Sequence, residues 1–273
     1  LQAIMDASRA IMCGDGDLYI ACGVESMTRA PFVMPKTTTP FGREPQIYDT
    51  TLGWRFTNKK LAELYHPYTM GETAENVAKQ WNISRHAQDK FAFDSQQKYF
   101  AAQAENKFKD EILPVHVQIG KDLFEFDKDE HPRQTTFEKL RQLQPAFVKD
   151  GTVTAGNSSG INDGAAAIIL ANEKAVKKYG LTPMAKIVSM AVAGVDPAIM
   201  GIGPVADTKK ALERAGLTVA DLDLIELNEA FASQSIACIH DLGLDLEKVN
   251  VNGGAIALGH PLGCSGVRIS TTL

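Results

Sequence analysis

The chain opens with apolar and polar positions in helical spacing. The apolar side chains that share one face of this helix are Leu1, Ile4, Met5, Ile11 and Met12. A Gly-Asp-Gly-Asp turn follows at residues 14–17, and an unbroken apolar run extends from Leu18 to Cys22. Such a run is typical of a strand that is buried on both faces of a parallel sheet. We therefore predict a helix, a turn and a fully buried strand.

The pattern changes between about residues 26 and 150, where prolines are frequent and charged residues interrupt the apolar ones. Two amphipathic helices are predicted here, one over Met70–Trp81 and one that begins after Ser84 as its N-cap. Long excursions are usually lids or linkers, and the helical patterning favours a lid. We interpret this stretch as a helical insertion that covers the sheet.

Strands and helices alternate again after residue 160. Residues 186–195 and 222–227 have the pattern of strands, and residues 206–215 have that of an amphipathic helix. This alternation predicts the α/β class, with a mostly parallel sheet that helices cover on both faces.

Composition and charge narrow the range of functions. The 273 residues carry a formal net charge of -5, which leaves no basic face for a nucleic-acid backbone. No apolar run approaches the roughly 20 residues of a membrane span, and no leader pattern opens the chain, so a bacterial cytoplasm is expected, with an organelle as the alternative. The four cysteines lack paired CxxC spacing, which argues against zinc and against a disulfide framework.

Three segments combine small residues with polar groups at strand-to-helix junctions, where α/β proteins place their ligands. They are Thr154–Gly160, Asn228–Phe231 and the glycine-rich Asn252–Gly266, which contains His260. Each has an ordinary structural alternative. A glycine hinge with an incidental histidine, a helix N-cap at Asn228 and a Gly/Ser turn would give the same patterns.

Taken together, the segments resemble one family, the thiolases, which are acyl-CoA:acetyl-CoA C-acyltransferases. The resemblance covers essentially the whole chain, and it also includes Ala21–Met27 and Met70–Glu75. It implies a layered αβαβα thiolase fold built from two related mixed-sheet halves. Residues 1–160 would be the remainder of the first half, with a loop domain at about 26–150, and residues 161–273 would be a truncated second half.

The resemblance also implies a mechanism for cleaving 3-ketoacyl-CoA. His260 would activate the nucleophilic cysteine, and Asn228 would hold a water that forms, with His260, an oxyanion hole for the thioester enolate. The positions that would line the pantetheine tunnel are Ala155, Ser159, Met70, Ala230 and Phe231. CoA and acyl-CoA would be substrates, no metal or prosthetic group is expected, and the protein would be a homodimer or homotetramer.

In this resemblance the nucleophilic cysteine maps a few residues before Leu1, and the acid/base cysteine maps beyond Leu273. The chain is therefore expected to be an internal fragment, inactive by this mechanism. Cys264 lies nearest to His260 in sequence, but its position is not one of the family's catalytic cysteines. The remaining histidines are expected at solvated surface positions; they are His66, His86, His116, His131 and His240.

Particular residues favour or exclude some of the alternative functions. Thr69 stands where acetoacetyl-CoA-forming thiolases typically place a histidine, which favours a degradative enzyme of fatty-acid β-oxidation or aromatic degradation, including enzymes for 3-oxoadipyl-CoA. A decarboxylating ketoacyl synthase would have a second histidine at Asn228, so we exclude it. A non-catalytic thiolase-like protein that binds acyl-CoA is the alternative from another class.

Overall fold

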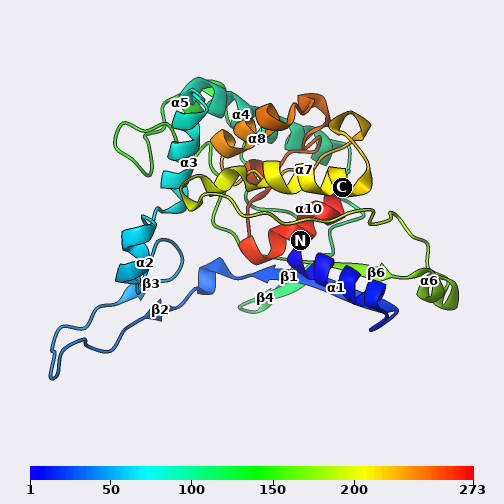
Figure 1. The fold of residues 1–273 in the computed structure, drawn as a ribbon, viewed down its shortest axis with the longest axis horizontal. Helices are drawn as coiled ribbons and strands as arrows, with labels where there is room; N and C mark the ends of the chain where they lie inside the picture. Colours follow the sequence, from blue (N-terminus) through cyan, green and yellow to red (C-terminus); the bar gives the residue numbers. More distant parts are fainter.

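The structure, a computed structural model, describes residues 1–273. Figure 1 shows a two-stranded sheet, with the helices of the main body above it. The helices are α1 (Gln2–Cys13), α2 (Lys59–Leu64), α3 (Met70–Gln80), α4 (Arg85–Ala104), α5 (Phe137–Arg141), α6 (Glu173–Tyr179), α7 (Gly203–Ala215), α8 (Ala232–Leu242), α9 (Ala255–Leu258) and α10 (Leu262–Thr272). None of them combines the length and apolarity that crossing a bilayer requires.

The sheet is formed by β1 (Leu18–Glu25) and β6 (Gly164–Ala171), which run antiparallel from the pair Leu18 and Ala171 to the pair Glu25 and Gly164. Both α1 and α10 pack on one face of this sheet. The side chains that form this core are Ile4, Ala7, Ala21, Leu170 and Val267. On the opposite face Ile20 and Ile169 are exposed, so β1 is not the fully buried strand that its apolar run predicts.

The second layer consists of α3, α4, α7 and α8. Thr69 and Glu72 form a capping box that starts α3, and the Ser84 hydroxyl accepts a hydrogen bond from the Ala87 N–H at the start of α4. Both predicted helices of the insertion are therefore confirmed. Because α8 lies between α3, α4 and α7, most of its side chains are buried.

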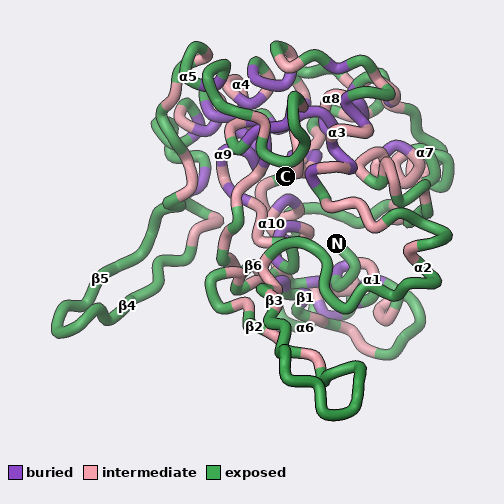
Figure 2. The backbone as a smooth tube through the Cα atoms, turned by 90° about the vertical axis from the view of Figure 1, so that its left-hand side faces the viewer, coloured by how far each residue is buried: buried purple, intermediate pink, exposed green.

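Two hairpins extend from the main body (Figure 2). The first joins β2 (Phe32–Val33) to β3 (Tyr48–Asp49), and the second joins β4 (Val115–Ile119) to β5 (Asp122–Phe126). Every residue of β4 and β5 is exposed. The insertion therefore contains hairpins as well as the helices that its pattern predicts.

The predicted parallel sheet is wrong in two respects. The one extensive strand pair is antiparallel, and residues 186–195 form no strand. Their backbone carbonyls instead accept side-chain hydrogen bonds from α7, at 2.7 Å from Arg214 to Met190 and at 3.1 Å from Lys210 to Val192. Residues 222–227 contribute only one parallel bridge, between Ile225 and Val249.

Candidate active site

His260 lies in the turn between α9 and α10, and this turn is held from a distant part of the chain. The His260 backbone N–H donates to Oδ1 of Asn162 at 3.1 Å. Gly259 just before it has φ 99°, in the left-handed region, and a side chain there would collide with Asn162. The glycine therefore allows Asn162 to approach the backbone and fix the position of the histidine.

Asn228 follows the segment that bridges to Val249, and a second asparagine stabilises this segment. The Asn250 side chain accepts from the Leu227 N–H and donates to the Leu227 carbonyl, both at 2.8 Å. The Asn228 amide Nδ2 then lies 3.4 Å from Nε2 of His260. The structure thus brings together the two residues that the motifs single out, although they come from two separate turns.

Hydrogen bonds to the Glu229 carboxylate connect the two turns that carry Asn228 and His260. Its carboxylate is buried and accepts hydrogen bonds from the Ser95 hydroxyl at 2.7 Å, from Asn250 Nδ2 at 2.8 Å and from the Ile256 N–H at 3.1 Å. Gly254 leaves room for this carboxylate, because a side chain there would collide with it. The segment after Asn228 and the segment before His260 are therefore fastened to the same buried group.

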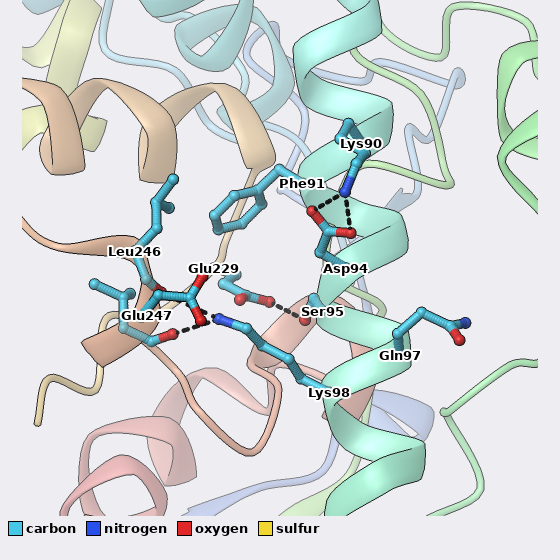
Figure 3. A pocket seen from close by; sticks show the side chains of 10 residues that line it. Lys90, Phe91, Asp94, Ser95, Gln97, Lys98, Glu229, Leu246 and Glu247 are labelled. Carbon is cyan, nitrogen blue, oxygen red and sulfur yellow. Dashed lines mark hydrogen bonds and ion pairs between the residues drawn. The ribbon is translucent and has the colours of Figure 1, made fainter.

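A cavity lies on the α4 side of Glu229 (Figure 3). It is lined by residues of α4 and of the turn at Leu246–Lys248, and the ammonium of Lys98 reaches across to the Val249 carbonyl at 2.8 Å. Neither Asn228 nor His260 lines this cavity. It is therefore separate from the chemical centre of the candidate site.

The electrostatic environment favours a neutral imidazole at His260. Burial lowers the pKa of His260, and the positive charge of Arg268 lowers it further. Arg268 in turn lies 3.4 Å from Glu226, whose pKa burial raises to about 7. A neutral imidazole can accept a proton, which is what a general base requires.

The positions expected to line the tunnel adjoin the same turns. The backbone N–H and the hydroxyl of Ser159 each lie 3.0 Å from the Ala230 carbonyl, and both donate to it. The Phe231 ring packs edge-on against Phe147, with 5.9 Å between centroids. Phe147 also fills the space beside Gly71, next to Met70. Ala155 is exposed, at the edge of the Thr154–Gly160 segment.

Asn162 and Phe147 lie outside the three candidate segments, so no sequence pattern marks them. Ser265 on α10 lies within Asn252–Gly266, but nothing in that segment distinguishes it from its neighbours. His131 was expected at the surface, but it is partly buried and its ring lies against Gly160. Burial lowers the pKa of His131. The other four histidines of the predicted surface set are exposed.

The cysteines also differ from expectation. Cys22 is exposed, although its strand was predicted to be buried, because its side chain lies on the uncovered face of the sheet. Cys238 and Cys264 are buried, and burial raises the pKa of both thiols, to about 11 for Cys238. Neither buried thiol is therefore activated as a nucleophile.

Family models agree with the motifs. The thiolase N-terminal domain matches residues 1–174, and the thiolase C-terminal domain matches residues 181–273. The chain belongs to the thiolase family. Membership confirms the thiolase fold and the thiolytic acyltransferase activity that the motifs imply.

This chain is similar in sequence to curated thiolases over the length that it shares with them. A beta-ketoadipyl-CoA thiolase of Escherichia coli is 54% identical, over 99% of this chain and 68% of its own. The 3-oxoadipyl-CoA/3-oxo-5,6-dehydrosuberyl-CoA thiolase of Escherichia coli K12 is 53% identical, with the same coverage of both chains. An acetyl-CoA acetyltransferase of Allochromatium vinosum is 50% identical, over 100% of this chain and 69% of its own.

Solved thiolases have the same fold. Human mitochondrial 3-ketoacyl-CoA thiolase superimposes with a TM-score of 0.90 and 46% identity, over 100% of this chain and 68% of its own. The same human enzyme in complex with CoA superimposes with a TM-score of 0.89 and 44% identity, over 100% of this chain and 67% of its own. The chain thus spans about two thirds of the length of the thiolases it matches.

Proposed function

We propose that this thiolase is degradative and cleaves 3-oxoadipyl-CoA, or a closely similar 3-ketoacyl-CoA, with His260 and Asn228 at its reaction centre. The approach of Asn228 Nδ2 to His260 Nε2, at 3.4 Å, carries the proposal for the reaction centre. Thr69 in place of a histidine supports the degradative direction, and so do the two Escherichia coli relatives named for ketoadipyl substrates.

His260 acts first as a general base. A cysteine thiol gives its proton to Nε2 of His260, and the thiolate attacks the keto carbon of the substrate. The bond between the keto carbon and the α-carbon then breaks, which leaves an acyl group on the cysteine and the enolate of acetyl-CoA. An acid protonates the enolate carbon, and CoA attacks the acyl-cysteine to release the shortened acyl-CoA.

Asn228 and His260 then stabilise the enolate. The negative charge develops on the thioester oxygen, where hydrogen-bond donors in a buried site are most effective. A water held by Asn228 and the Nε2–H of His260 would be these donors. The Oδ1 atom of Asn228 is buried and has no protein partner, so part of this amide remains available for such contacts.

The attacking thiol is assigned by family resemblance to a position ahead of Leu1. The buried thiols of Cys238 and Cys264 do not qualify, because burial raises their pKa. Neither buried cysteine is therefore the attacking thiol in this proposal.

The pantetheine arm of CoA would pass along Met70, Ala155, Ser159, Ala230 and Phe231. Phe147 joins this set, because its ring connects Phe231 to the start of α3. We also expect self-association into a homodimer or homotetramer. Exposed apolar side chains such as Phe124 and Phe126 on β5 provide surface that a second copy could cover.

Thiolysis by the full-length protein tests the roles and the substrate. His260→Ala and Asn228→Ala should each lower kcat by about 100-fold or more, since a general base or an oxyanion-hole donor is worth that much. His240→Ala, on an exposed position of α8, is the matched control and should retain full activity. Full activity of His260→Ala would overturn the proposal.

The substrate is tested with acetoacetyl-CoA, a medium-chain 3-ketoacyl-CoA and 3-oxoadipyl-CoA. We expect the highest kcat/KM with 3-oxoadipyl-CoA. A clear preference for acetoacetyl-CoA would overturn the degradative assignment, while leaving the reaction chemistry as proposed.

A further inference from the structure

Ser265 lies directly behind the catalytic imidazole. It is on the first turn of α10, only 4% of it is exposed, and its Oγ lies 2.6 Å from Nδ1 of His260. The same Oγ lies 3.0 Å from the backbone carbonyl of Pro261, four residues earlier in the chain. The hydroxyl therefore stands between one ring nitrogen and one carbonyl oxygen.

The number of available protons determines which atom donates and which accepts in this contact. A hydroxyl has one hydrogen, and the Pro261 carbonyl can only accept. If Ser265 donates to Pro261, Nδ1 of His260 carries the proton and donates to Oγ. Nε2 is then unprotonated and accepts from the Asn228 amide, which lies 3.4 Å away. Every short contact in this arrangement pairs a donor with an acceptor.

The opposite arrangement satisfies the surroundings less well. If Ser265 donates to Nδ1, the ring proton sits on Nε2 and faces the NH₂ group of Asn228, which is also a donor. Turning the Asn228 amide over would relieve this conflict. It would, however, place the NH₂ group where the buried Oδ1 now has no partner, and leave its hydrogens without an acceptor. The first arrangement is therefore favoured.

We infer that Ser265 is a positioning residue, which holds the proton of His260 on Nδ1 and so keeps Nε2 open for the proton of the attacking thiol. This inference rests on the proposed function. When Nε2 accepts that proton, the imidazolium retains its Nδ1–H bond to Oγ, and Ser265 retains its bond to Pro261. Proton transfer thus requires no change in the hydrogen bonds behind the ring.

A hydroxyl in this place has a different effect from a carboxylate. An acidic partner on Nδ1 would stabilise the imidazolium and raise the pKa of the histidine. Ser265 orients the ring without adding charge, so the lowering of the pKa of His260 by burial and by Arg268 is preserved. His260 therefore remains a neutral base at neutral pH, ready to accept the proton.

The chain offers a matched control on the same helix. Ser270 of α10 donates to the Gly266 carbonyl at 3.0 Å, four residues earlier, as Ser265 does to Pro261. Its hydroxyl has no hydrogen bond to a histidine in the structure. Ser270→Ala therefore removes the same backbone contact without touching the imidazole.

The first test is ¹⁵N NMR of the histidine rings in the full-length protein, which distinguishes a protonated from an unprotonated ring nitrogen. We expect Nδ1–H in the wild-type protein and in Ser265→Thr, and a shift of population toward Nε2–H in Ser265→Ala. Wild-type His260 with its proton on Nε2 would overturn the inference. This readout does not depend on activity, so it is separate from the test of the proposed function.

Thiolysis kinetics give the second test. Ser265→Ala should lower kcat/KM by about 10- to 100-fold, the range found when the hydrogen-bond partner that orients a metal-binding histidine is removed. The acidic limb of its pH profile should move to lower pH, because the imidazolium loses an acceptor. Ser265→Thr should restore both the rate and the profile, and Ser270→Ala should behave as wild type. An equal loss of rate in Ser270→Ala would show that the effect is structural only.

Discussion

Glu226→Gln should remove part of the pH dependence of stability. Glu226 is two residues before Asn228, and only 6% of its side chain is exposed. Burial raises its pKa to about 7, even though Arg268 lies 3.4 Å away and acts in the opposite direction. In the folded protein the carboxyl therefore keeps its proton to a higher pH than it does in the unfolded chain.

The sign of the effect follows from this difference in proton binding. Between the ordinary glutamate pKa of 4.5 and the raised value of about 7, the native state holds a proton that the unfolded chain has lost. The free energy of unfolding therefore falls as pH rises through this window. At 1.36 kcal/mol per pKa unit, this one group accounts for at most about 3 kcal/mol. Glutamine does not titrate, so the variant lacks this contribution.

Urea denaturation at several pH values from 4.5 to 8 measures the effect. The stability of wild type should fall more steeply with pH than that of Glu226→Gln, and the difference between the two curves isolates this carboxyl. Glu213→Gln on the exposed side of α7 is the control and should follow the wild-type curve. Parallel curves for wild type and Glu226→Gln would refute the reasoning.

Three further predictions concern packing and reactivity. Gly254→Ala should lower the free energy of unfolding by about 1–3 kcal/mol in a urea titration, because its methyl group would press on the Glu229 carboxylate; an unchanged midpoint would contradict this. Iodoacetamide at pH 8 should label the exposed Cys13 and spare the buried Cys238, as read by mass spectrometry; rapid labelling of Cys238 in the native protein would count against its raised pKa. Phe147→Ala should raise KM for acyl-CoA more than it lowers kcat, and a loss confined to kcat would argue against a place in the tunnel.

Local signals in the sequence predicted the helices well. Ser84 is the N-cap that the sequence predicts, and the two helices of the insertion begin at Met70 and Arg85, as their patterns indicate. The helix predicted over residues 206–215 also forms, as part of α7. Such signals act within a few residues, so they can be read without knowledge of the fold.

Pairing between distant segments could not be predicted in this way. The apolar run at β1 shows that a strand forms, but not that its partner is the antiparallel β6. Residues 186–195 have a strand pattern, yet no neighbouring strand pairs with them. Side chains of α7 donate hydrogen bonds to their carbonyls instead. Tertiary context decides such cases, because strand formation depends on what lies alongside.

In the candidate site, too, the sequence identified some residues and not others. His260 and Asn228 were singled out by the motifs around them, and the structure brings the two side chains together. Asn162 was not, because its importance comes from a contact 98 residues away in the chain. Ser265 lies in the same segment as His260, but the sequence does not show that its hydroxyl faces the imidazole. A polar residue in a turn or on a helix has no distinguishing pattern until its partner is known.

The hydrogen bond from the His260 backbone to Asn162 crosses the boundary between the two family domains, since Asn162 belongs to the part matched as N-terminal and His260 to the part matched as C-terminal. In a chimera that exchanged either domain with that of another thiolase, the histidine would come from one parent. The residue that accepts the hydrogen bond from its backbone would come from the other parent. Recombination within this family should therefore succeed only when both halves of that contact are inherited together.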